Sequence, residues 1–537
     1  MHGFFGSYGQ VFKWDLTAFN SKSFVARQHN MQSLHVEQIT LPKFLNDKYF
    51  LEEDDCFIAT EGVLFEADSA TEAIRRYRQG ETCFWKSWRG SFCGLLYDSR
   101  TDTLLVFNDH IGSKMLFYAQ TENAFVFASD LQAINRAIGP TADYSHFAQA
   151  IIDSGCTNDN STFVSNIHRL TAGQYLCVHG TDLRITEYHR FDNTPYPYDE
   201  TTMVAQADRL FRQAVERVIR KNEQEGLQHF FPLSGGLDSR MCQWIAHETA
   251  SQPITNYTYS QSNHYDHLIP KEISTFLGNK WLFCPLDGGR YITDVDGVCA
   301  RTEWLVNYMG PIEIDYFARH QDWQQVGVVL TGVNGDNIFA TETDNAHEMA
   351  RIYTQGFNGN SLGSPLVLQH YTESYSPFCD VDVLNYVLHI PTVKRRNYYF
   401  YDRWILTCYP EAAQWHHKHV QIGHRPAMVT VAGRNIPVRN IPARIAGFVL
   451  RRLHICETNR EAKGVSMTPY DDWIKENPQI LTELYSYYSS HKHLLSNTAL
   501  LTACEEKMRI GSIMDKGRVL TILSAIQHLC ATDTDNG

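Results

Sequence analysis

Hydrophobic residues follow two different spacings along the chain. From about residue 55 to 190, short alternating or apolar runs are separated by turn residues, which is typical of β-strands. Helical spacing appears between these runs, over residues 70–77 and 144–150. This part is therefore predicted to form sheets covered by helices. The strands are predicted at 56–59, 90–97, 104–107, 115–119, 124–128 and 174–178.

A turn-rich segment with two prolines, 191–199, ends this pattern and marks a domain boundary. An amphipathic helix follows at 203–221, and short apolar runs then alternate with helical ones, which predicts a parallel sheet with helices on both faces. Its strands are predicted at 229–233, 256–260, 281–285 and 326–330, with helices at 239–250 and 268–277. Helical spacing dominates beyond about residue 345. Because the boundary lies at 191–199, we expect two domains, at residues 1–192 and 200–537.

The composition narrows the classes of function. A chain of 537 residues with 43% hydrophobic and 20% charged residues can bury large cores, so it is globular. Its 47 basic and 60 acidic residues give a net charge of −13, which argues against nucleic acid as a partner. The thirteen cysteines include no C-x-x-C pair, which indicates reduced thiols and a cytoplasmic protein. No apolar run is long enough to predict a membrane span.

The loop at 232–240 carries the most specific motif. It reads Pro-Leu-Ser-Gly-Gly-Leu-Asp-Ser-Arg, directly between a predicted strand and a predicted helix. The glycines let the backbone approach an anion, the serines add hydroxyl donors, and the helix supplies N–H groups and its positive end. No Gly-Lys-Ser/Thr follows, so this is not a Walker loop. The alternative is a plain Gly-Gly turn. The phosphate-binding residues assigned here are Leu233, Ser234, Gly235, Gly236, Leu237, Asp238 and Ser239.

A second turn follows the predicted strand at 326–330. It runs from Thr331 and Gly332 to Asp336, and we assign Thr331 and Gly332 to the same ligand site. Both turns would lie at the carboxyl ends of parallel strands, where a doubly wound sheet binds its ligand. An aspartate beside phosphate implies a metal ion between them, so Asp238 and Asp336 are the candidate Mg²⁺ ligands. The alternative for Asp336 is a turn residue that faces solvent.

These motifs resemble those of a known family. The loop resembles the pyrophosphate loop of ATP pyrophosphatases, and both turns together resemble the synthetase half of class B asparagine synthetases, β-lactam synthetases and lasso peptide cyclases. Residues 256–260 resemble the strand that lines the adenine pocket, which assigns Tyr259 to the nucleotide, and 376–383 resemble the Pro-Phe-Leu-Asp segment. The N-terminal region resembles the family's glutaminase domain at 90–98, 108–112 and 125–130.

The resemblance implies a fold and a chemistry. It implies an N-terminal Ntn-hydrolase-like αββα sandwich, then a Rossmann-like ATP-pyrophosphatase domain with a helical C-terminal part. The cofactors would be ATP and Mg²⁺. Residues 467–473 and 518–526 are similar, more loosely, to asparagine-synthetase-like proteins of bacterial surface-polysaccharide loci.

The N-terminal region departs from that family at the nucleophile. A working glutaminase of this type needs cysteine after Met1, because its free amine serves as the base. His2 occupies that position, and Cys56 lies too deep in the chain to acquire a free amine without cleavage. We therefore expect a glutaminase fold without glutaminase activity, as in β-lactam synthetases.

The synthetase half also departs from the family. Val333 replaces the glutamate of its second turn, and its lysine falls within 397–399. Lys394 and Arg395 stand nearby and are the candidates for a cation that stabilises charge on the acyl-adenylate. Glu373 is a candidate base for an incoming amine, and the alternative is a solvated loop glutamate.

The segment 418–456 is locally basic. It has seven lysines and arginines and no acidic residue, interleaved with apolar runs. Such a segment could hold an acidic or lipid-linked substrate near the inner face of the cell membrane. The alternative is a segment that packs over the helical region with its arginines in solvent.

The sequence as a whole favours an ATP-dependent, AMP-forming amide ligase. It would adenylate a small-molecule, sugar or peptide carboxylate and transfer the acyl group to an amine or ammonia. One alternative is a non-catalytic, nucleotide-binding scaffold protein, suggested by Val333 and the missing lysine. A full glutamine-hydrolysing asparagine synthetase is a further alternative, but it requires a nucleophile that the N-terminus lacks.

Overall fold

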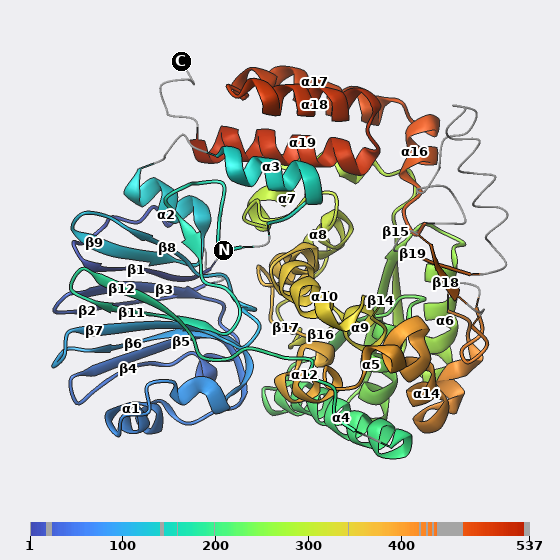
Figure 1. Ribbon diagram of the computed structural model, residues 1–537, viewed down its shortest axis with the longest axis horizontal. Helices are drawn as coiled ribbons and strands as arrows, with labels where there is room; N and C mark the ends of the chain where they lie inside the picture. The colour runs from blue at the N-terminus through green and yellow to red at the C-terminus, as the bar shows by residue number, and fades with distance from the viewer. Residues whose placement is uncertain are drawn as a thin grey trace.

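A computed structural model shows two sheet-containing regions side by side, with helices from the end of the chain lying across both (Figure 1). The structure describes residues 2–17, 24–139, 144–157, 159–197, 199–341, 343–417, 420–425, 428–431, 434–437 and 466–530.

Two six-stranded antiparallel sheets form the N-terminal sandwich. The first has the order β10-β8-β9-β1-β3-β2 and the second the order β12-β11-β7-β6-β5-β4. The strands of the first are β1 (Gly3–Gly9), β2 (Val25–Met31), β3 (Leu34–Thr40), β8 (Phe117–Gln120), β9 (Ala124–Ala128) and β10 (His168–Arg169). Those of the second are β4 (Phe50–Glu53), β5 (Cys56–Glu66), β6 (Arg89–Asp98), β7 (Thr103–Asn108), β11 (Gln174–His179) and β12 (Asp182–Glu187).

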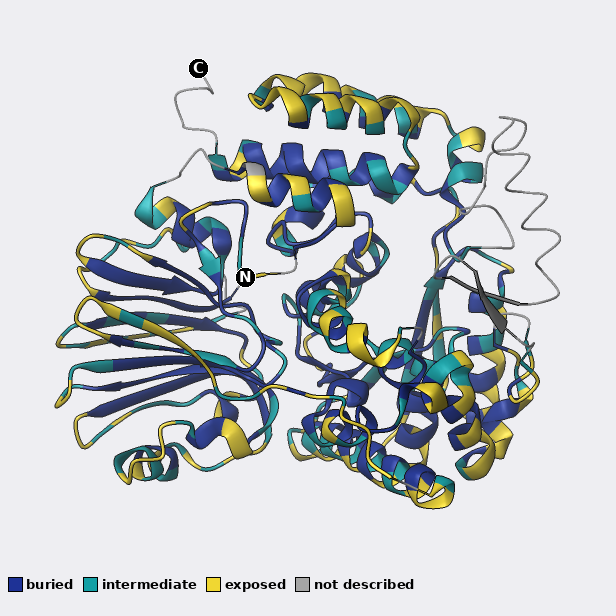
Figure 2. Cartoon of the chain, in the orientation of Figure 1, coloured by how far each residue is buried: buried dark blue, intermediate teal, exposed yellow. Residues whose placement is uncertain are grey.

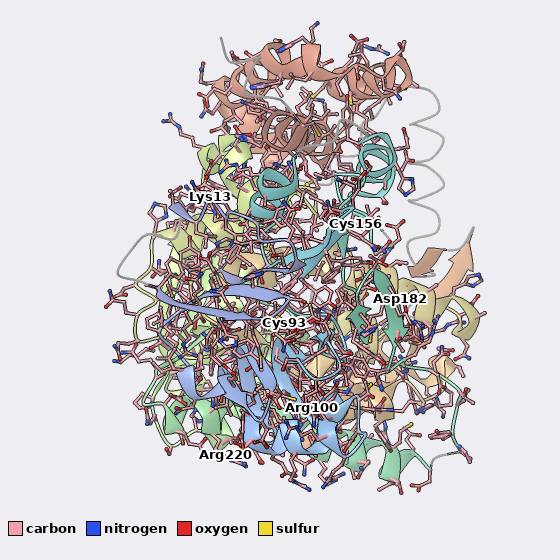
Figure 3. The ribbon with its side chains drawn as sticks, turned by 90° about the vertical axis from the view of Figure 1, so that its left-hand side faces the viewer. Lys13, Cys93, Arg100, Cys156, Asp182 and Arg220 are labelled. Carbon is pink, nitrogen blue, oxygen red and sulfur yellow. The ribbon has the colours of Figure 1, made fainter. Side chains whose placement is uncertain are left out.

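Hydrophobic layers hold the sandwich together. Phe4, Phe57 and Leu95 belong to the buried cluster between the two sheets. Figure 3 views the sandwich from the side, with Cys93 of β6 among its side chains. Trp85 and α1 (Ala70–Arg78) cover the outer face of the second sheet. Helices α2 (Leu131–Ile138) and α3 (Ser145–Ser154) pack against the first, which completes the predicted αββα arrangement.

The second sheet-containing region has parallel strands. Strands β13 (His229–Pro232), β14 (Ile254–Ser260) and β15 (Lys280–Pro285) pair in that order, and β16 (Val329–Leu330) pairs with β17 (Ser374–Tyr375). A bridge between Gln228 and Val326 joins β13 to the segment before β16. The order is therefore β15-β14-β13-β16-β17, and the chain changes direction across the sheet between β13 and β16. That is the switch point of a Rossmann-like sheet, which confirms the predicted fold class.

Helices surround this sheet. Those nearest to it in sequence are α4 (Glu200–Gln224), α5 (Leu237–Thr249), α6 (Tyr265–Leu277), α7 (Val295–Arg301), α8 (Ile312–Arg319), α9 (Gly335–Phe339), α10 (Asn345–Arg351) and α11 (Gly363–Leu368). Next come α12 (Val381–Val387), α13 (Thr392–Arg395), α14 (Tyr399–Cys408) and a hairpin of β18 (Met428–Val431) and β19 (Arg434–Pro437). The chain then forms α16 (Tyr470–Glu476), α17 (Gln479–His491), α18 (Thr498–Ile510) and α19 (Ile513–Ala525).

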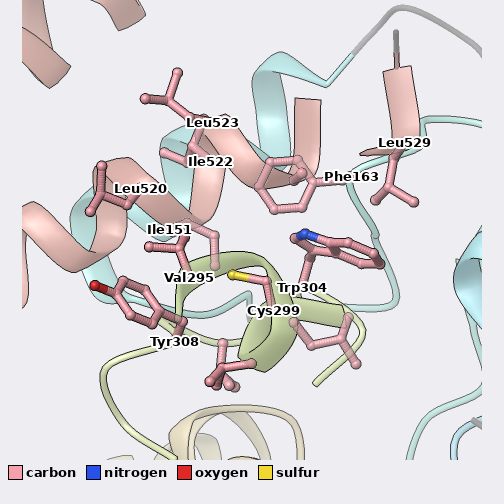
Figure 4. Close-up of a cluster of buried hydrophobic side chains, with 14 of the residues drawn as sticks. Ile151, Phe163, Val295, Cys299, Trp304, Tyr308, Leu520, Ile522, Leu523 and Leu529 are labelled. Atoms are coloured by element: carbon pink, nitrogen blue, oxygen red, sulfur yellow. The ribbon is translucent and has the colours of Figure 1, made fainter. Parts of the chain in front are cut away.

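Helix α19 connects the two regions through a shared core. It lies against α3 and α7, and Figure 4 shows Ile151, Val295 and Leu520 in one buried cluster. Figure 2 shows α19 almost wholly buried, whereas α17 and α18 expose one face. The C-terminal helices therefore fix the sandwich relative to the parallel sheet.

A buried ion pair and a partly buried one cross the same boundary. Lys114 of the sandwich pairs with Glu373, and their side chains are 5% and 2% exposed. Arg89 makes two hydrogen bonds to Asp382, at 3.0 and 2.7 Å. A buried charge such as that of Lys114 or Glu373 is tolerated only when paired, so this pair favours one relative position of the two regions.

Two further features bear on the environment of the protein. The cysteines within the described ranges are all free thiols. In the same ranges, no helix combines the length and the apolar character that crossing a membrane requires.

Candidate active site

The predicted anion loop joins β13 to α5 and is held in a tight conformation. Ser239 Oγ accepts a hydrogen bond from Ser234 N at 2.9 Å and lies 2.9 Å from Ser234 Oγ. Gly235 N donates to Asp266 Oδ1 at 2.9 Å. A Cβ at Gly235 would lie 2.8 Å from the ring of Tyr265, so only glycine fits there. The loop thus presents its hydroxyl groups and the start of α5 to one side.

The second predicted turn packs directly against this loop. A Cβ at Gly332 would lie 2.7 Å from Asp238 Cβ, and one at Gly335 would lie 2.3 Å from Asp238 Cγ. Asp336 N donates to Asp238 Oδ2 at 3.1 Å. The two glycines therefore allow the close approach, and the structure brings Asp238 and Asp336 together at the switch point, as the motif spacing predicts.

Two tyrosines that the sequence did not single out complete this contact. Tyr401 OH donates to Asp238 Oδ1 at 2.8 Å. The pKa of Tyr398 is raised, first by burial and then by the negative charges of Asp336 and Asp238. Tyr398 belongs to the segment 397–399, where the family's lysine was expected, and Tyr401 follows in α14. Aromatic hydroxyl groups therefore face the carboxylates there.

Two adjoining cavities open beside the loop. One, of about 410 Å³, is named the phosphate cavity here and is lined by Ser234, Gly236, Leu237, Asp238, Tyr265, Asp266, Asp336, His417, Ser466 and Met467. The other, of about 300 Å³, includes Leu233, Ser239, Tyr259, Thr331 and Gly332 in its lining. Asp238 lines both cavities. All the residues assigned to nucleotide binding from the sequence, apart from Gly235 in the base of the loop, therefore line one or both cavities.

The donor set fits Mg²⁺ held together with phosphate. Among the described residues, no group of three or more His, Cys, Asp or Glu side chains is placed to hold a metal. Mg²⁺ in proteins is usually bound by one or two carboxylates, with phosphate oxygens and water completing the shell. Asp238 and Asp336 supply two carboxylates at the phosphate cavity. Two carboxylates suit a Mg²⁺ ion that is also bound by phosphate and water, and they are too few for a site made of protein ligands alone.

The predicted cations lie elsewhere. Arg395 is fully buried and donates to Ile338 O at 2.8 Å and to Glu348 Oε2 at 2.7 Å. Lys394 is exposed, with its Nζ 5.4 Å from the centre of the Tyr399 ring. Neither lines a cavity beside the loop, so the structure does not place these two predicted cations at the candidate site. Arg395 stabilises the end of α9 instead.

Glu373 also differs from expectation. It is 1% exposed and pairs with Lys114 across the boundary between the two regions. Its backbone oxygen accepts from Val329 N at 2.8 Å, because it immediately precedes β17 in the sheet. It is therefore neither a solvated loop residue nor part of the two cavities, and the structure gives it an interdomain role.

His2 is buried at the position of the expected nucleophile. It is 4% exposed, its Nε2 lies 2.6 Å from Gln369 O, and its Nδ1 lies 3.4 Å from Glu61 Oε1. The ring thus bridges the sandwich and the parallel-sheet region. Cys56 is fully buried in β5, and burial raises the pKa of its thiol, so it does not supply a nucleophile.

The structure describes only part of the basic segment 418–456. Of its seven basic side chains, that of Arg425 is described, and it binds Asp402 through two bonds of 2.8 Å. Its guanidinium lies 3.9 Å from the centre of the Tyr398 ring. The other basic side chains of 418–456 lie outside the described residues, so contact with a membrane or a lipid-linked substrate stays a prediction.

A comparison with known protein families finds a likeness for part of the sandwich. Residues 55–189 match the model of the glutamine amidotransferase domain family. This part of the chain is similar to glutamine amidotransferase domains. This match covers β5 to β12 and the helices between them, and it lies within the region 1–192 that is predicted to be glutaminase-like.

Two curated proteins resemble longer parts of the chain. "Amidase chry2" of Gibberella zeae is 23% identical over 212 residues, and "Asparagine synthetase [glutamine-hydrolyzing] 1" of Bacillus subtilis (strain 168) is 20% identical over 285 residues. These alignments cover 39% and 52% of this chain but only 31% and 44% of the relatives. The chain thus spans less than half the length of either relative.

Solved structures show weaker likeness. The glutamine phosphoribosylpyrophosphate amidotransferase of B. subtilis matches with a TM-score of 0.25 and 10% identity, covering 53% of this chain and 91% of that one. The NH3-dependent NAD synthetase of Campylobacter jejuni matches with a TM-score of 0.18 and 13% identity, covering 27% and 61%. Such scores do not establish a shared fold, which rests here on the sheet topology.

Proposed function

We propose that this protein is an ATP-dependent, AMP-forming amide ligase that adenylates a carboxylate and transfers the acyl group to an amine or ammonia. The observation that carries the proposal is the meeting of two glycine turns at the switch point, with Asp336 N bound to Asp238 Oδ2 beside a cavity of about 410 Å³. A strand-loop-helix unit with two serines and two carboxylates is suited to a metal-bound polyphosphate.

The residues of the site take different roles in this proposal. Ser234, Ser239 and the start of α5 would hold the pyrophosphate portion, and Asp238 and Asp336 would hold Mg²⁺, which offsets phosphate charge when bound. Leu233, Tyr259, Thr331 and Gly332 would line the space for the rest of the nucleotide. The substrate carboxylate would enter beside Val333, which also lines that cavity.

The N-terminal sandwich would not hydrolyse glutamine. Its position for the nucleophile is taken by His2, which is buried between Gln369 O and Glu61. The nitrogen would then come from a second substrate, either ammonia or an amine on a small molecule, a sugar or a peptide.

A non-catalytic nucleotide-binding protein is the competing proposal. It is favoured by one observation: no lysine or arginine is among the described residues that line the two cavities. A ligase needs positive charge or hydrogen-bond donors that stabilise the leaving pyrophosphate. The two proposals must therefore be separated by an assay of turnover.

The deciding experiment is pyrophosphate and AMP release from Mg-ATP, measured across a panel of carboxylates with and without amines. The ligase predicts equal amounts of AMP and pyrophosphate that depend on a carboxylate. Binding of ATP without turnover on any carboxylate would favour the non-catalytic alternative, and ADP with phosphate would reject the adenylation chemistry.

A further inference from the structure

The lining of the phosphate cavity includes a histidine, His417, besides the residues of the loop. Three carboxylates, those of Asp238, Asp266 and Asp336, line this cavity. An anion that enters must be balanced by hydrogen-bond donors as well as by a metal. Among the described residues of the lining, His417 is the one with nitrogen in its side chain, and it is 3% exposed.

Arg425 fixes the hydrogen on the His417 ring. Its Nη1 and Nη2 both lie 3.3 Å from His417 Nδ1. A guanidinium can only donate, so Nδ1 is the acceptor and the ring hydrogen is on Nε2. Arg425 is itself held by Asp402 and by the face of Tyr398, 3.9 Å away. The imidazole is therefore a neutral donor through Nε2, with its tautomer set by a cation behind it.

Arg240 ties the segment that carries His417 to the anion loop. It is fully buried in the first turn of α5 and donates to Gly235 O at 3.1 Å. It also donates to the carbonyl oxygens of three residues just before His417: Ala412 at 3.2 Å, Trp415 at 2.8 Å and His416 at 2.9 Å. Burial lowers the pKa of Arg240 to about 10, so it remains charged at neutral pH. One guanidinium thus links both walls of the cavity and adds positive charge behind them.

We propose that His417 is a phosphate-binding residue of this site, with Arg425 and Arg240 as its positioning residues. Its Nε2–H donates to a phosphate oxygen of Mg-ATP and then to pyrophosphate. As a carboxylate oxygen bonds to the α-phosphorus, the bond from that phosphorus to the bridging oxygen breaks and the electron pair leaves with pyrophosphate. His417 stabilises that charge by a hydrogen bond and transfers no proton. The assignment rests on the proposed function, because it concerns the same cavity.

The test compares two neighbouring histidines. His417→Ala removes the donor, and His417→Gln retains an N–H on a chain of similar reach. His416→Ala is the matched control, because the His416 side chain is exposed. Binding of inorganic pyrophosphate with Mg²⁺ is measured by calorimetry, and thermal unfolding shows whether each variant is folded.

The expected results separate this assignment from the proposed function. His417→Ala should weaken pyrophosphate binding by about 10- to 100-fold, His417→Gln by less than about tenfold, and His416→Ala not at all. Arg425→Met should resemble His417→Ala and lower kcat more than it raises KM for ATP. Suppose that the wild-type protein turns over ATP, and that folded His417→Ala binds pyrophosphate as tightly as wild type. That result would overturn the role of His417 and leave the proposed function standing. A wild-type protein that binds neither ATP nor pyrophosphate would overturn both proposals.

Discussion

At the scale of single residues, Asp238 is the side chain on which the two turns meet. Its Oδ1 accepts from Tyr401 OH and its Oδ2 from Asp336 N. An asparagine can keep the bond from Asp336 and donate to the tyrosine oxygen, so Asp238→Asn should fold normally. It loses only the charge that binds a metal. We expect ATP-to-AMP turnover to fall by at least about 100-fold, measured as pyrophosphate release.

Tyr401→Phe provides the control for that change. It removes one donor to Asp238 but keeps the carboxylate, so the loss of turnover should stay below about tenfold. If folded Asp238→Asn retained wild-type turnover, Asp238 could not be a metal ligand.

The same scale shows which site residues a sequence can reveal. Asp238 and Asp336 were predictable together because each follows a buried strand of one parallel sheet, and such turns share an edge. The position of Arg395 was not predictable, because nearness in sequence does not fix the direction of a side chain, and this one donates to Ile338 O inside the fold. His417 gave no signal, since only tertiary contacts through Arg240 bring its segment to the loop.

At the scale of elements, the approach of the two turns depends on glycine. A Cβ at Gly335 would lie 2.3 Å from Asp238 Cγ. That distance is too short for two carbon atoms, so Asp238 or the second turn would have to move. Gly335→Ala should therefore lower ATP turnover strongly and reduce the free energy of unfolding by about 1–3 kcal/mol. Pyrophosphate release and urea unfolding measure the two effects.

Gly310→Ala is the matched control for the glycine substitution. A Cβ there would meet only Asn307 O, at 3.3 Å, so both quantities should stay near wild type. Equal behaviour of the two variants would mean that the turns do not need this close contact.

The elements themselves were predicted unevenly. The strand at 326–330 is shorter than its apolar pattern suggested, because Asn222 of α4 replaces a neighbouring strand and bonds Val328 N at 2.7 Å and Val328 O at 3.0 Å. Strand β1 gave no strand pattern, since its first six residues are all buried and Gly6 packs on the ring of Phe127. A strand buried on both faces loses the alternation by which strands are recognised.

At the scale of the whole molecule, a buried charge network joins the sandwich to the parallel-sheet region. Glu61 lies near Lys48 and His2, at 3.6 and 3.4 Å. Burial would raise the pKa of Glu61, but Lys48, His2 and Lys114 together lower it to about 2. A lowered pKa means that the carboxylate stabilises the fold above its ordinary pKa of 4.5 and that this contribution disappears as the pH falls toward 2.

Glu61→Gln tests this network by urea unfolding across pH. It should cost about 3–5 kcal/mol at neutral pH, because buried cations lose their partner. The difference from wild type should narrow steadily between pH 4.5 and about 2, as wild-type Glu61 becomes protonated. Glu81→Gln, in an exposed pair with Arg76, should change little at any pH. A difference that is independent of pH would contradict the charge pairing.

The buried His2 leads to a prediction about the whole sandwich. Because its ring bridges Glu61 and Gln369 O, this position offers neither a thiol nor an open pocket for a nucleophile. Purified protein should release no glutamate from glutamine, with or without ATP and a carboxylate. Coupled glutamate detection measures this, and activity that disappears on changing His2 would show that the sandwich is a working glutaminase.

If the sandwich supplies no ammonia, the nitrogen must reach the second site from solution. Ammonia is mostly ammonium at neutral pH, which is no nucleophile, and a site left open for it would let water take the acyl-adenylate. An amine on a larger substrate brings binding energy that positions it and excludes water. We therefore expect ammonium alone to support only slow AMP formation, and an amino acid, amino sugar or peptide amine to accelerate it. Isotope-labelled ammonium assayed beside a panel of amines decides between them, because rapid and saturable incorporation of the label into an amide would make ammonia the true substrate.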